Sequence, residues 1–214
     1  MSPSHQATIS YYDQIAETYA NSACKRDMTS AMSPFLEILQ PHGLLLDLGS
    51  GAGRDSLKFE ELGHSVVSID RSFGLLKEHK MRGGDWLLSA DMEFLPFPEN
   101  RFHGVWACAS LLHIPKVKIQ KVLAEVKRVL LPGGIFFSAM KSGTGEGTKL
   151  SEVGVPCIAD QPSAQNSGRY WSFYQKDEWL ENLENAGFST IWSSMTADQA
   201  GRDLRWLNVL VISK

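Results

Sequence analysis

A short apolar stretch in the first quarter of the chain ends in a pattern that suits ligand binding. Residues 44–53, LLLDLGSGAG, hold an apolar run of strand length, one acid at Asp47, and glycines at alternate positions after the run. Glycines between a parallel strand and the following helix let backbone N–H groups approach a ligand closely. The sequence therefore predicts that this turn contacts a nucleotide-like molecule.

Two further acids follow the next two predicted strands. Asp70 ends the stretch HSVVSID, and Asp91 ends the stretch DWLLSAD. Because the carboxyl ends of parallel strands meet at one edge of a sheet, we expect both acids to lie near Asp47. A pyrophosphate is repelled by carboxylates, whereas the sulfonium and ammonium groups of S-adenosylmethionine are attracted. The three acids favour S-adenosylmethionine over a dinucleotide, and Arg54 stands where a dinucleotide-binding loop has its last glycine.

The elements around these residues predict an α/β fold with a doubly wound, mostly parallel sheet. Apolar strand-like stretches alternate with amphipathic helical stretches through most of the chain, which is typical of parallel βαβ units. Only a short polar stretch separates the last two strands, so we expect these two to pair antiparallel. The predicted strands are 44–48, 64–70, 85–91, 102–110, 135–140, 188–194 and 205–213, and the predicted helices are 54–62, 72–80, 116–130 and 177–186.

The whole chain, 1–214, is expected to form a single domain with two regions near the ligand. Apolar residues from Ile9 to Tyr19 recur at helical spacing and predict one helix that packs over the sheet. We expect residues 1–40 to form a helical lid. Residues 141–174, which begin with the glycine-rich stretch KSGTGEGTKL, are expected to form a mobile loop region on the substrate side.

Bulk composition argues against several classes of partner. The chain has 214 residues, a formal net charge of −3 and a pI near 6.1, so no overall positive field attracts nucleic acid. No apolar run approaches the roughly 18 residues that span a bilayer, and the polar start MSPSHQATIS does not resemble a signal peptide. We expect a cytoplasmic protein, monomeric or homodimeric, without a membrane or nucleic-acid partner. Its basic cluster is expected to be a solvated helix face: Lys116, Lys118, Lys121, Lys127 and Arg128.

Cysteine and histidine usage predicts neither disulfides nor a metal site. The three cysteines, Cys24, Cys108 and Cys157, are odd in number and widely spaced. The six histidines form no pair at metal-binding spacing. We therefore expect reduced thiols and no bound metal.

Longer stretches of the chain resemble the class I S-adenosylmethionine-dependent methyltransferases, in particular the small bacterial, type 11-like members. The matching stretches are LLLDLGSGAGRDS, VVSIDRS, SADMEFLPFPENRFHGVWACASLLHIP and VLAEVKRVLLPGGIFFSAMK, and the ending GRYWSFYQKDEWLENLENAGFSTIW is also similar. The resemblance implies a seven-stranded sheet with an antiparallel last strand, and S-adenosylmethionine as cofactor. The motifs and the resemblance together give these expected cofactor-binding residues: Asp47, Gly49, Ser50, Gly51, Gly53, Arg54, Asp70, Arg71, Ser72, Asp91, Met92, Ala107 and Cys108.

The residues that would face the methyl acceptor are predicted less directly. Methyl transfer is an in-line displacement that needs a base only if the nucleophile arrives protonated. His113 follows the fourth strand and is either a general base or a histidine that hydrogen-bonds a neighbouring loop. An arginine among aromatics in GRYWSFY suits a planar acid, although alternating aromatics are also typical of a core. The expected substrate-side residues are Tyr12, Tyr19, His113, Arg169, Tyr170 and Tyr174.

Four functions remain open from the sequence. The leading hypothesis is methyl transfer to an oxygen or nitrogen atom of a small molecule. A tRNA methyltransferase acting on a modified wobble uridine is the second, because RYWSFY before the last helix loosely resembles such enzymes. The third is an NAD(P)-dependent oxidoreductase, and the fourth is a cofactor-binding regulator without turnover. The sequence ACAS stands where base N-methyltransferases have a DPPY-type motif, which argues against that chemistry.

Overall fold

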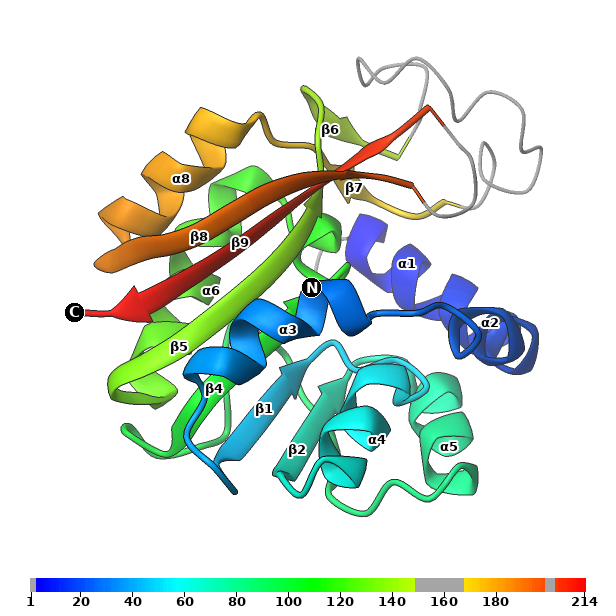
Figure 1. The fold of residues 1–214 in the computed structure, drawn as a ribbon. Coiled ribbons are helices and arrows are strands. Elements are labelled where there is room, and N and C mark those ends of the chain that lie inside the picture. Colours follow the sequence, from blue (N-terminus) through cyan, green and yellow to red (C-terminus); the bar gives the residue numbers. More distant parts are fainter. Residues whose placement is uncertain (1–2, 149–167, 199–202) are drawn as a thin grey trace.

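The central feature of the fold is one seven-stranded sheet. The computed structural model describes residues 3–148, 168–198 and 203–214. The strand order is β3-β2-β1-β4-β5-β9-β8 (Figure 1). The strands are β1 (Leu44–Leu48), β2 (Ser65–Asp70), β3 (Leu87–Ser89), β4 (Phe102–Cys108), β5 (Leu130–Lys141), β8 (Phe188–Ala197) and β9 (Arg205–Ser213).

Pairing within this sheet confirms the predicted topology. The first five strands pair in parallel, and β9 runs antiparallel to both of its neighbours, β5 and β8. The chain places β8 at the edge and then returns through β9 into the space beside β5. The last strand is therefore the antiparallel one, as the resemblance implied.

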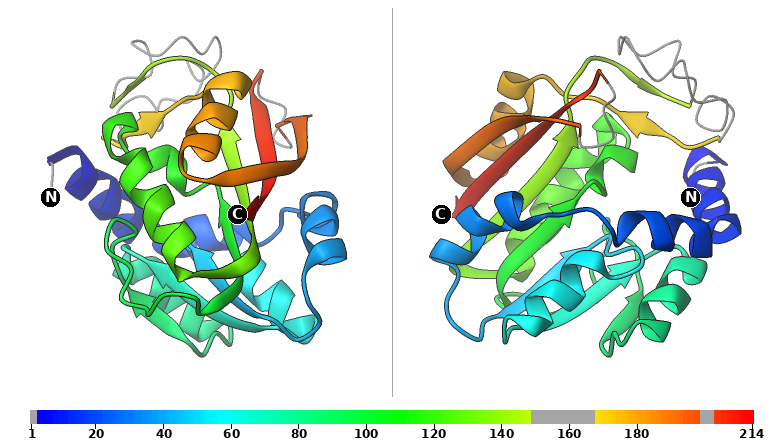
Figure 2. Two further views of the ribbon diagram at one scale, coloured as in Figure 1. Left: turned by 90° about the vertical axis from the view of Figure 1, so that its left-hand side faces the viewer. Right: turned by 45° about the vertical axis from the view of Figure 1, so that its right-hand side comes forward.

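Helices cover both faces of the sheet (Figure 2). One face carries α3 (Thr29–Ile38) and α4 (Arg54–Glu61), and the other carries α6 (Lys116–Val129) and α8 (Lys176–Asn185). The helix α5 (Phe73–Met81) follows β2, and its N-cap Ser72 accepts a hydrogen bond from the Leu75 amide at 3.1 Å. None of the helices in the described part of the chain is long and apolar enough to cross a membrane.

The core beneath α3 is built from large aromatic side chains. Trp106 of β4 stacks on Phe137 of β5 with ring centroids 3.9 Å apart, and Phe35 of α3 meets Trp106 edge-on. Phe59 of α4 completes this cluster. These contacts fix α3 and α4 on the sheet below the edge where the strands end.

The N-terminal region differs from the single helix predicted for it. It forms two helices, α1 (Pro3–Gln14) and α2 (Ala16–Ala23), with a break at Ile15, whose φ is −109° and ψ is 14°. The break lets α2 pack closely on α5, where a Cβ at Gly74 would lie 3.1 Å from the Ala16 Cβ. In contrast, α1 contacts the segment that contains Tyr170: the Thr8 hydroxyl accepts a hydrogen bond from the Tyr170 amide at 2.9 Å. The apolar residues predicted as one helix thus pack against two different parts of the chain: α2 packs on α5, and α1 packs on the segment that contains Tyr170.

The glycine-rich stretch after β5 is also more ordered than a loop. Glu146–Gly147 forms β6, which pairs antiparallel with β7 (Trp171–Ser172). The Glu146 carboxylate accepts hydrogen bonds from the Lys116 amide at 2.7 Å and from the Ser172 hydroxyl at 3.3 Å. The prediction of a loop is therefore wrong for these residues. Residues 149–167, and with them Cys157, lie outside the described part of the chain.

Candidate cofactor and acceptor site

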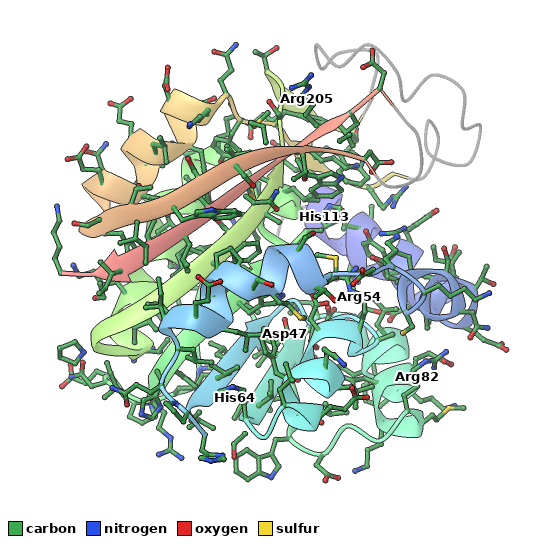
Figure 3. All side chains as sticks on the ribbon, in the orientation of Figure 1. Asp47, Arg54, His64, Arg82, His113 and Arg205 are labelled. Atoms are coloured by element: carbon green, nitrogen blue, oxygen red, sulfur yellow. The ribbon has the colours of Figure 1, made fainter. Side chains whose placement is uncertain are left out.

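A cavity lies at the carboxyl edge of β1, β2 and β4. Asp47, Arg54 and His113 lie toward this edge, whereas His64 lies at the opposite end of the sheet (Figure 3). The glycine turn, the end of β2, the segment after β4 and the first two helices all contribute. The lining residues are Thr8, Ile9, Tyr12, Tyr19, Ala23, Cys24, Arg26, Asp47, Gly49, Ser50, Gly51, Ala52, Arg54, Asp55, Asp70, Arg71, Ser72, Leu75, Met92, Cys108, Ala109, Ser110, His113 and Ile114.

The glycine turn brings backbone against the segment that follows β4. Gly49 has a φ of 80°, and a Cβ there would lie 2.3 Å from the Ser110 Cβ. Only glycine fits both the conformation and the space. The buried hydroxyls of Ser50 and Ser110 have no hydrogen-bond partner among the described residues, and both residues line the cavity. Buried polar atoms of this kind call for a partner, so they fit a polar ligand held at this turn.

Asp70 is held in a fixed orientation at the end of β2. Its carboxylate accepts hydrogen bonds from the Gly51 amide at 2.9 Å and the Ser72 amide at 2.8 Å. Burial raises the pKa of Asp70, and the backbone N–H groups around it oppose that rise. The side chain lines the cavity, where it can accept hydrogen bonds from ribose hydroxyls.

Asp47 is a buried acid that also faces the cavity. It accepts a hydrogen bond from the Ser56 hydroxyl at 2.5 Å, and the Ser56 and Ser68 hydroxyls are 2.8 Å apart. Burial, with the neighbouring Asp55 carboxylate, raises the pKa of Asp47 to about 8. A cation in the cavity would favour the ionised form and lower this pKa. The arrangement therefore suits a positively charged ligand better than a pyrophosphate.

Arg54 forms a buried ion pair with its sequence neighbour. Its guanidinium donates to both Asp55 oxygens, at 2.6 and 2.7 Å, and the Trp106 indole donates to the same carboxylate at 2.8 Å. Arg54 also approaches the Cys108 sulfur at 3.4 Å. Burial raises the pKa of Cys108 to about 12, which keeps the thiol protonated. Arg54 thus lies as a fixed cation between the glycine turn and the end of β4.

Six of the predicted site residues lie outside the cavity lining, and three of these are Gly53, Ala107 and Tyr174. Gly53 is the N-cap residue of α4 and has a φ of 83°, and a Cβ there would lie 2.0 Å from the His79 ring, so this glycine makes room for His79. Ala107 is fully buried in the core on the α6 side, because alternation along β4 turns only Cys108 toward the cavity. Tyr174 is fully buried and packs against Trp179 with ring centroids 4.9 Å apart.

Asp91 lies behind the cavity lining. Its carboxylate pairs with Arg71 at 2.5 Å and accepts a hydrogen bond from the Glu93 amide at 3.0 Å. Asp91 does not line the cavity itself, whereas its partner Arg71 and its sequence neighbour Met92 do.

Arg169 and Tyr170 lie above α1, outside the cavity lining. The Arg169 guanidinium lies 4.4 Å from the Tyr11 ring centre and 4.8 Å from that of Trp171. Tyr170 contributes its backbone, since its amide binds Thr8 and its carbonyl oxygen binds His113. These contacts attach the segment after residue 167 to α1.

His113 is held at both ring nitrogens. Its Nδ1 lies 2.7 Å from the Tyr170 carbonyl oxygen, and its Nε2 lies 3.0 Å from the Tyr12 hydroxyl. A carbonyl oxygen only accepts, so Nδ1 carries the proton and Nε2 accepts from Tyr12. Burial raises the pKa of Tyr12, which keeps its hydroxyl a donor. A proton from a substrate would thus reach His113 by way of Tyr12 or after this bond breaks.

Several lining residues carry no signal in the sequence. Ala52 and Leu75 are small or apolar residues that are not distinctive in type, and Asp55 falls within the predicted helix 54–62. Others reach the cavity only because α1 and α2 fold over it: Thr8, Ile9, Ala23, Cys24 and Arg26. No three His, Cys, Asp or Glu side chains gather as a metal-binding group within the described ranges.

Comparisons with known proteins agree with this geometry. Residues 46–138 match the family described as Methyltransferase domain. Malonyl-[acyl-carrier protein] O-methyltransferase of Buchnera aphidicola is 37% identical over 102 residues, which cover 47% of this chain and 40% of that protein. Demethylmenaquinone methyltransferase of Renibacterium salmoninarum is 37% identical over 134 residues, which cover 59% of this chain and 56% of that protein. The chain thus spans about half the length of these curated relatives.

A solved structure extends the likeness to the whole fold. The 1,6-didemethyltoxoflavin-N1-methyltransferase of Burkholderia thailandensis, solved with 1,6-didemethyltoxoflavin and S-adenosylhomocysteine, superposes with a TM-score of 0.73 at 20% identity. The match covers 100% of this chain and 91% of that one. The domain match, the relatives and this fold together support a class I S-adenosylmethionine-dependent methyltransferase with S-adenosylmethionine as its cofactor. They give no support to the alternative of an NAD(P)-dependent oxidoreductase.

Proposed function

We propose that this protein transfers a methyl group from S-adenosylmethionine to an oxygen or nitrogen atom of a small molecule. The observation that supports the proposal is that Asp47, Asp70 and the end of β4 line one and the same cavity. The curated relatives act on malonyl-[acyl-carrier protein] and demethylmenaquinone according to their names, so small or carrier-bound acceptors are within reach of the family.

Several residues around the cavity are proposed to bind the methyl donor. When bound, S-adenosylmethionine supplies an electrophilic methyl group on a positively charged sulfur. Asp70 binds the ribose hydroxyls, Met92 covers one face of the adenine, and Asp47 attracts the cationic methionine portion. The backbone at Gly49 and Gly51 admits the ligand closely. Positioning is the main contribution to catalysis, since an aligned nucleophile about 3 Å from the methyl carbon needs little else.

We propose that Tyr12 and His113 accept the proton when the nucleophile arrives protonated. Tyr12 lines the cavity and already donates its hydroxyl proton to His113 Nε2. The Tyr170 carbonyl holds His113 in the tautomer that can accept this bond. Residues 1–40 serve as the lid over the bound donor, and residues 141–174 serve as the substrate-side region.

The tRNA alternative finds less support in the electrostatics. The basic cluster is largely ion-paired: Lys116 with Glu178 at 2.6 Å, Lys118 with Glu93 at 2.6 Å and Arg128 with Glu125 at 2.7 Å. RNA affinity depends mainly on cations that are available to neutralise phosphates. The buried Tyr174 also removes part of the RYWSFY stretch from the surface on which the tRNA hypothesis relied.

The test uses S-adenosylmethionine labelled in its methyl group. The protein is incubated with this donor and a cell extract, and the label is then separated into metabolites, RNA and protein. We expect label in small metabolites, which mass spectrometry identifies. Label in RNA that nuclease removes would support the tRNA alternative, and no transfer at all would support a regulator without turnover.

A further inference from the structure

We propose that a second cavity, on the α3 face of the sheet, holds the ring of the methyl acceptor, and that this ring is flat, aromatic and uncharged with one polar substituent. The inference rests on the proposed function and names the substrate class. The cavity lies between the start of α3 and the upper parts of β4, β5, β9 and β8. The following observations support it.

The floor of this cavity is one cross-strand row of small and polar residues. Cys108 pairs with Ala139, Ala139 with Asn208, and Asn208 with Ser194. The next row of the same face, closer to the core, is large and apolar: Trp106, Phe137, Leu210 and Trp192. The side of α3 that bears Met32 and Phe35 covers the large row. The change in side-chain size leaves space above the small row.

Tryptophan side chains form the apolar wall of the cavity. Trp192 and Trp206 come from neighbouring strands and both line the space. The Trp206 indole donates to the Asp198 carboxylate at 2.9 Å, which fixes the orientation of its ring. Rigid aromatic surfaces of this kind favour flat aromatic ligands.

Asn208 is the polar group at the centre of the floor. It is only 5% exposed, and its Nδ2 donates to the Thr196 hydroxyl at 3.1 Å. Its Oδ1 accepts no hydrogen bond from any residue in the described ranges. A ligand that places one hydroxyl or N–H group here would donate to this oxygen in place of solvent.

The charged residues of the cavity are engaged with protein groups, and its two carboxylates, Asp27 and Asp198, disfavour a ring that carries a negative charge. Asp27 accepts from the Thr29 amide and hydroxyl, Asp198 accepts from Trp206, and Arg54 pairs with Asp55. Arg26 lies at the junction and also lines the cofactor cavity, where the donor carries its own carboxylate.

The two cavities share one wall, which places the acceptor next to the methyl donor. Arg26, Arg54, Cys108 and Ala109 line both. An acceptor whose ring lies over Ala139 can extend its reacting atom past Cys108. There its lone pair forms the bond to the methyl carbon, the carbon–sulfur electron pair stays on sulfur, and any O–H or N–H proton leaves.

The test uses 2-naphthol, a flat ring with one hydroxyl, as the probe. Calorimetry measures its binding to the full chain saturated with S-adenosylhomocysteine. We expect binding in the presence of this ligand, because the two occupy different cavities. Ala139→Leu fills the floor of the second cavity and should weaken 2-naphthol binding by about tenfold or more. Binding of S-adenosylhomocysteine should change less than about twofold, because Ala139 does not line its cavity.

Ala124→Leu is the matched control, since Ala124 is exposed on α6 on the opposite face. This variant should bind both ligands as the wild type does. If Ala139→Leu fails to fold, Asn208→Ala replaces it and should weaken 2-naphthol binding with S-adenosylhomocysteine binding retained. Failure of 2-naphthol to bind, competition with S-adenosylhomocysteine, or unchanged binding to the variants overturns the inference. A wild-type protein that does not bind S-adenosylhomocysteine contradicts the proposed function instead.

Discussion

The two halves of the site are built from different parts of the chain. The donor half comes from strand ends and the turns directly after them, with Asp47, Gly49, Gly51 and Asp70 within one short segment. The proposed acceptor half comes from the start of α3, the ends of β4 and β5 and the last two strands, which only tertiary packing brings together. The first half is therefore constrained by local backbone geometry, whereas the second can vary without disturbing the first.

The largest effect should come from a substitution inside the donor half. Gly49→Ala adds a Cβ at a φ of 80° and 2.3 Å from the Ser110 Cβ, so either the turn or the segment after β4 must move. We expect binding of S-adenosylhomocysteine to fall by about 100-fold or more and the free energy of unfolding to fall by about 1–3 kcal/mol. Calorimetry and thermal unfolding measure the two quantities.

Gly83→Ala separates the backbone strain from the loss of space. Gly83 has a φ of 107°, but an added Cβ would meet nothing within 4 Å. This control should lower stability modestly and leave ligand binding intact. Equal losses of binding in the two variants would show that the close contact with Ser110 is not what shapes the site.

A smaller effect is expected at the end of β2. Asp70→Ala removes the acceptor of the Gly51 and Ser72 amides and the acceptor proposed for the ribose hydroxyls. We expect binding of S-adenosylhomocysteine to weaken by about 1–3 kcal/mol in calorimetry. Asp85→Ala, at an exposed acid paired with Lys80, should bind normally. An unchanged affinity of Asp70→Ala would remove this residue from the site.

The donor half of the site could be predicted from the sequence better than the acceptor half. The alternation of strands and helices was correctly predicted, because hydrophobic periodicity is a local property. The antiparallel last strand was correctly predicted from the short connection before it and from the family resemblance. The acids and glycines at the ends of β1 and β2 could be singled out because their types are unusual at those positions. Ala107 was wrongly predicted to line the cavity, because side chains alternate along β4 and its neighbour Cys108 faces the cavity instead. Tyr174 was wrongly predicted to face the substrate, because alternating aromatic residues are typical of both binding sites and cores. The break at Ile15 and the pairing of β6 with β7 depend on partners far away in sequence.

The pH dependence of donor binding should identify Asp47. Its pKa is raised to about 8 in the folded protein, so below that pH the side chain is mainly neutral. The ionised form attracts the cationic donor, and affinity for S-adenosylmethionine should therefore rise about tenfold between pH 7 and 9. Asp47→Asn should bind weakly with little dependence on pH. A wild-type affinity that falls over this range would contradict the role given to Asp47.

The smallest effect is expected at Tyr12 of α1, which lines the donor cavity. Tyr12→Phe removes the hydrogen bond to His113 Nε2 while keeping the ring that packs on Tyr19. We expect the free energy of unfolding to fall by about 1 kcal/mol and donor affinity to change little. The pH profile of methyl transfer should also shift, since His113 then loses its partner. Tyr11→Phe is the control. Equal effects of the two variants would argue against proton transfer through Tyr12 and His113.

The most direct test of the account is calorimetric titration of the wild-type protein with S-adenosylmethionine and, separately, with NAD. The cavity at the carboxyl edge of β1, β2 and β4 is assigned to a cationic methyl donor because of Asp47, Asp70 and the unsatisfied serine hydroxyls. We predict one equivalent of S-adenosylmethionine bound and no heat from NAD. Binding of NAD without S-adenosylmethionine, or of neither, would contradict the assignment of this cavity.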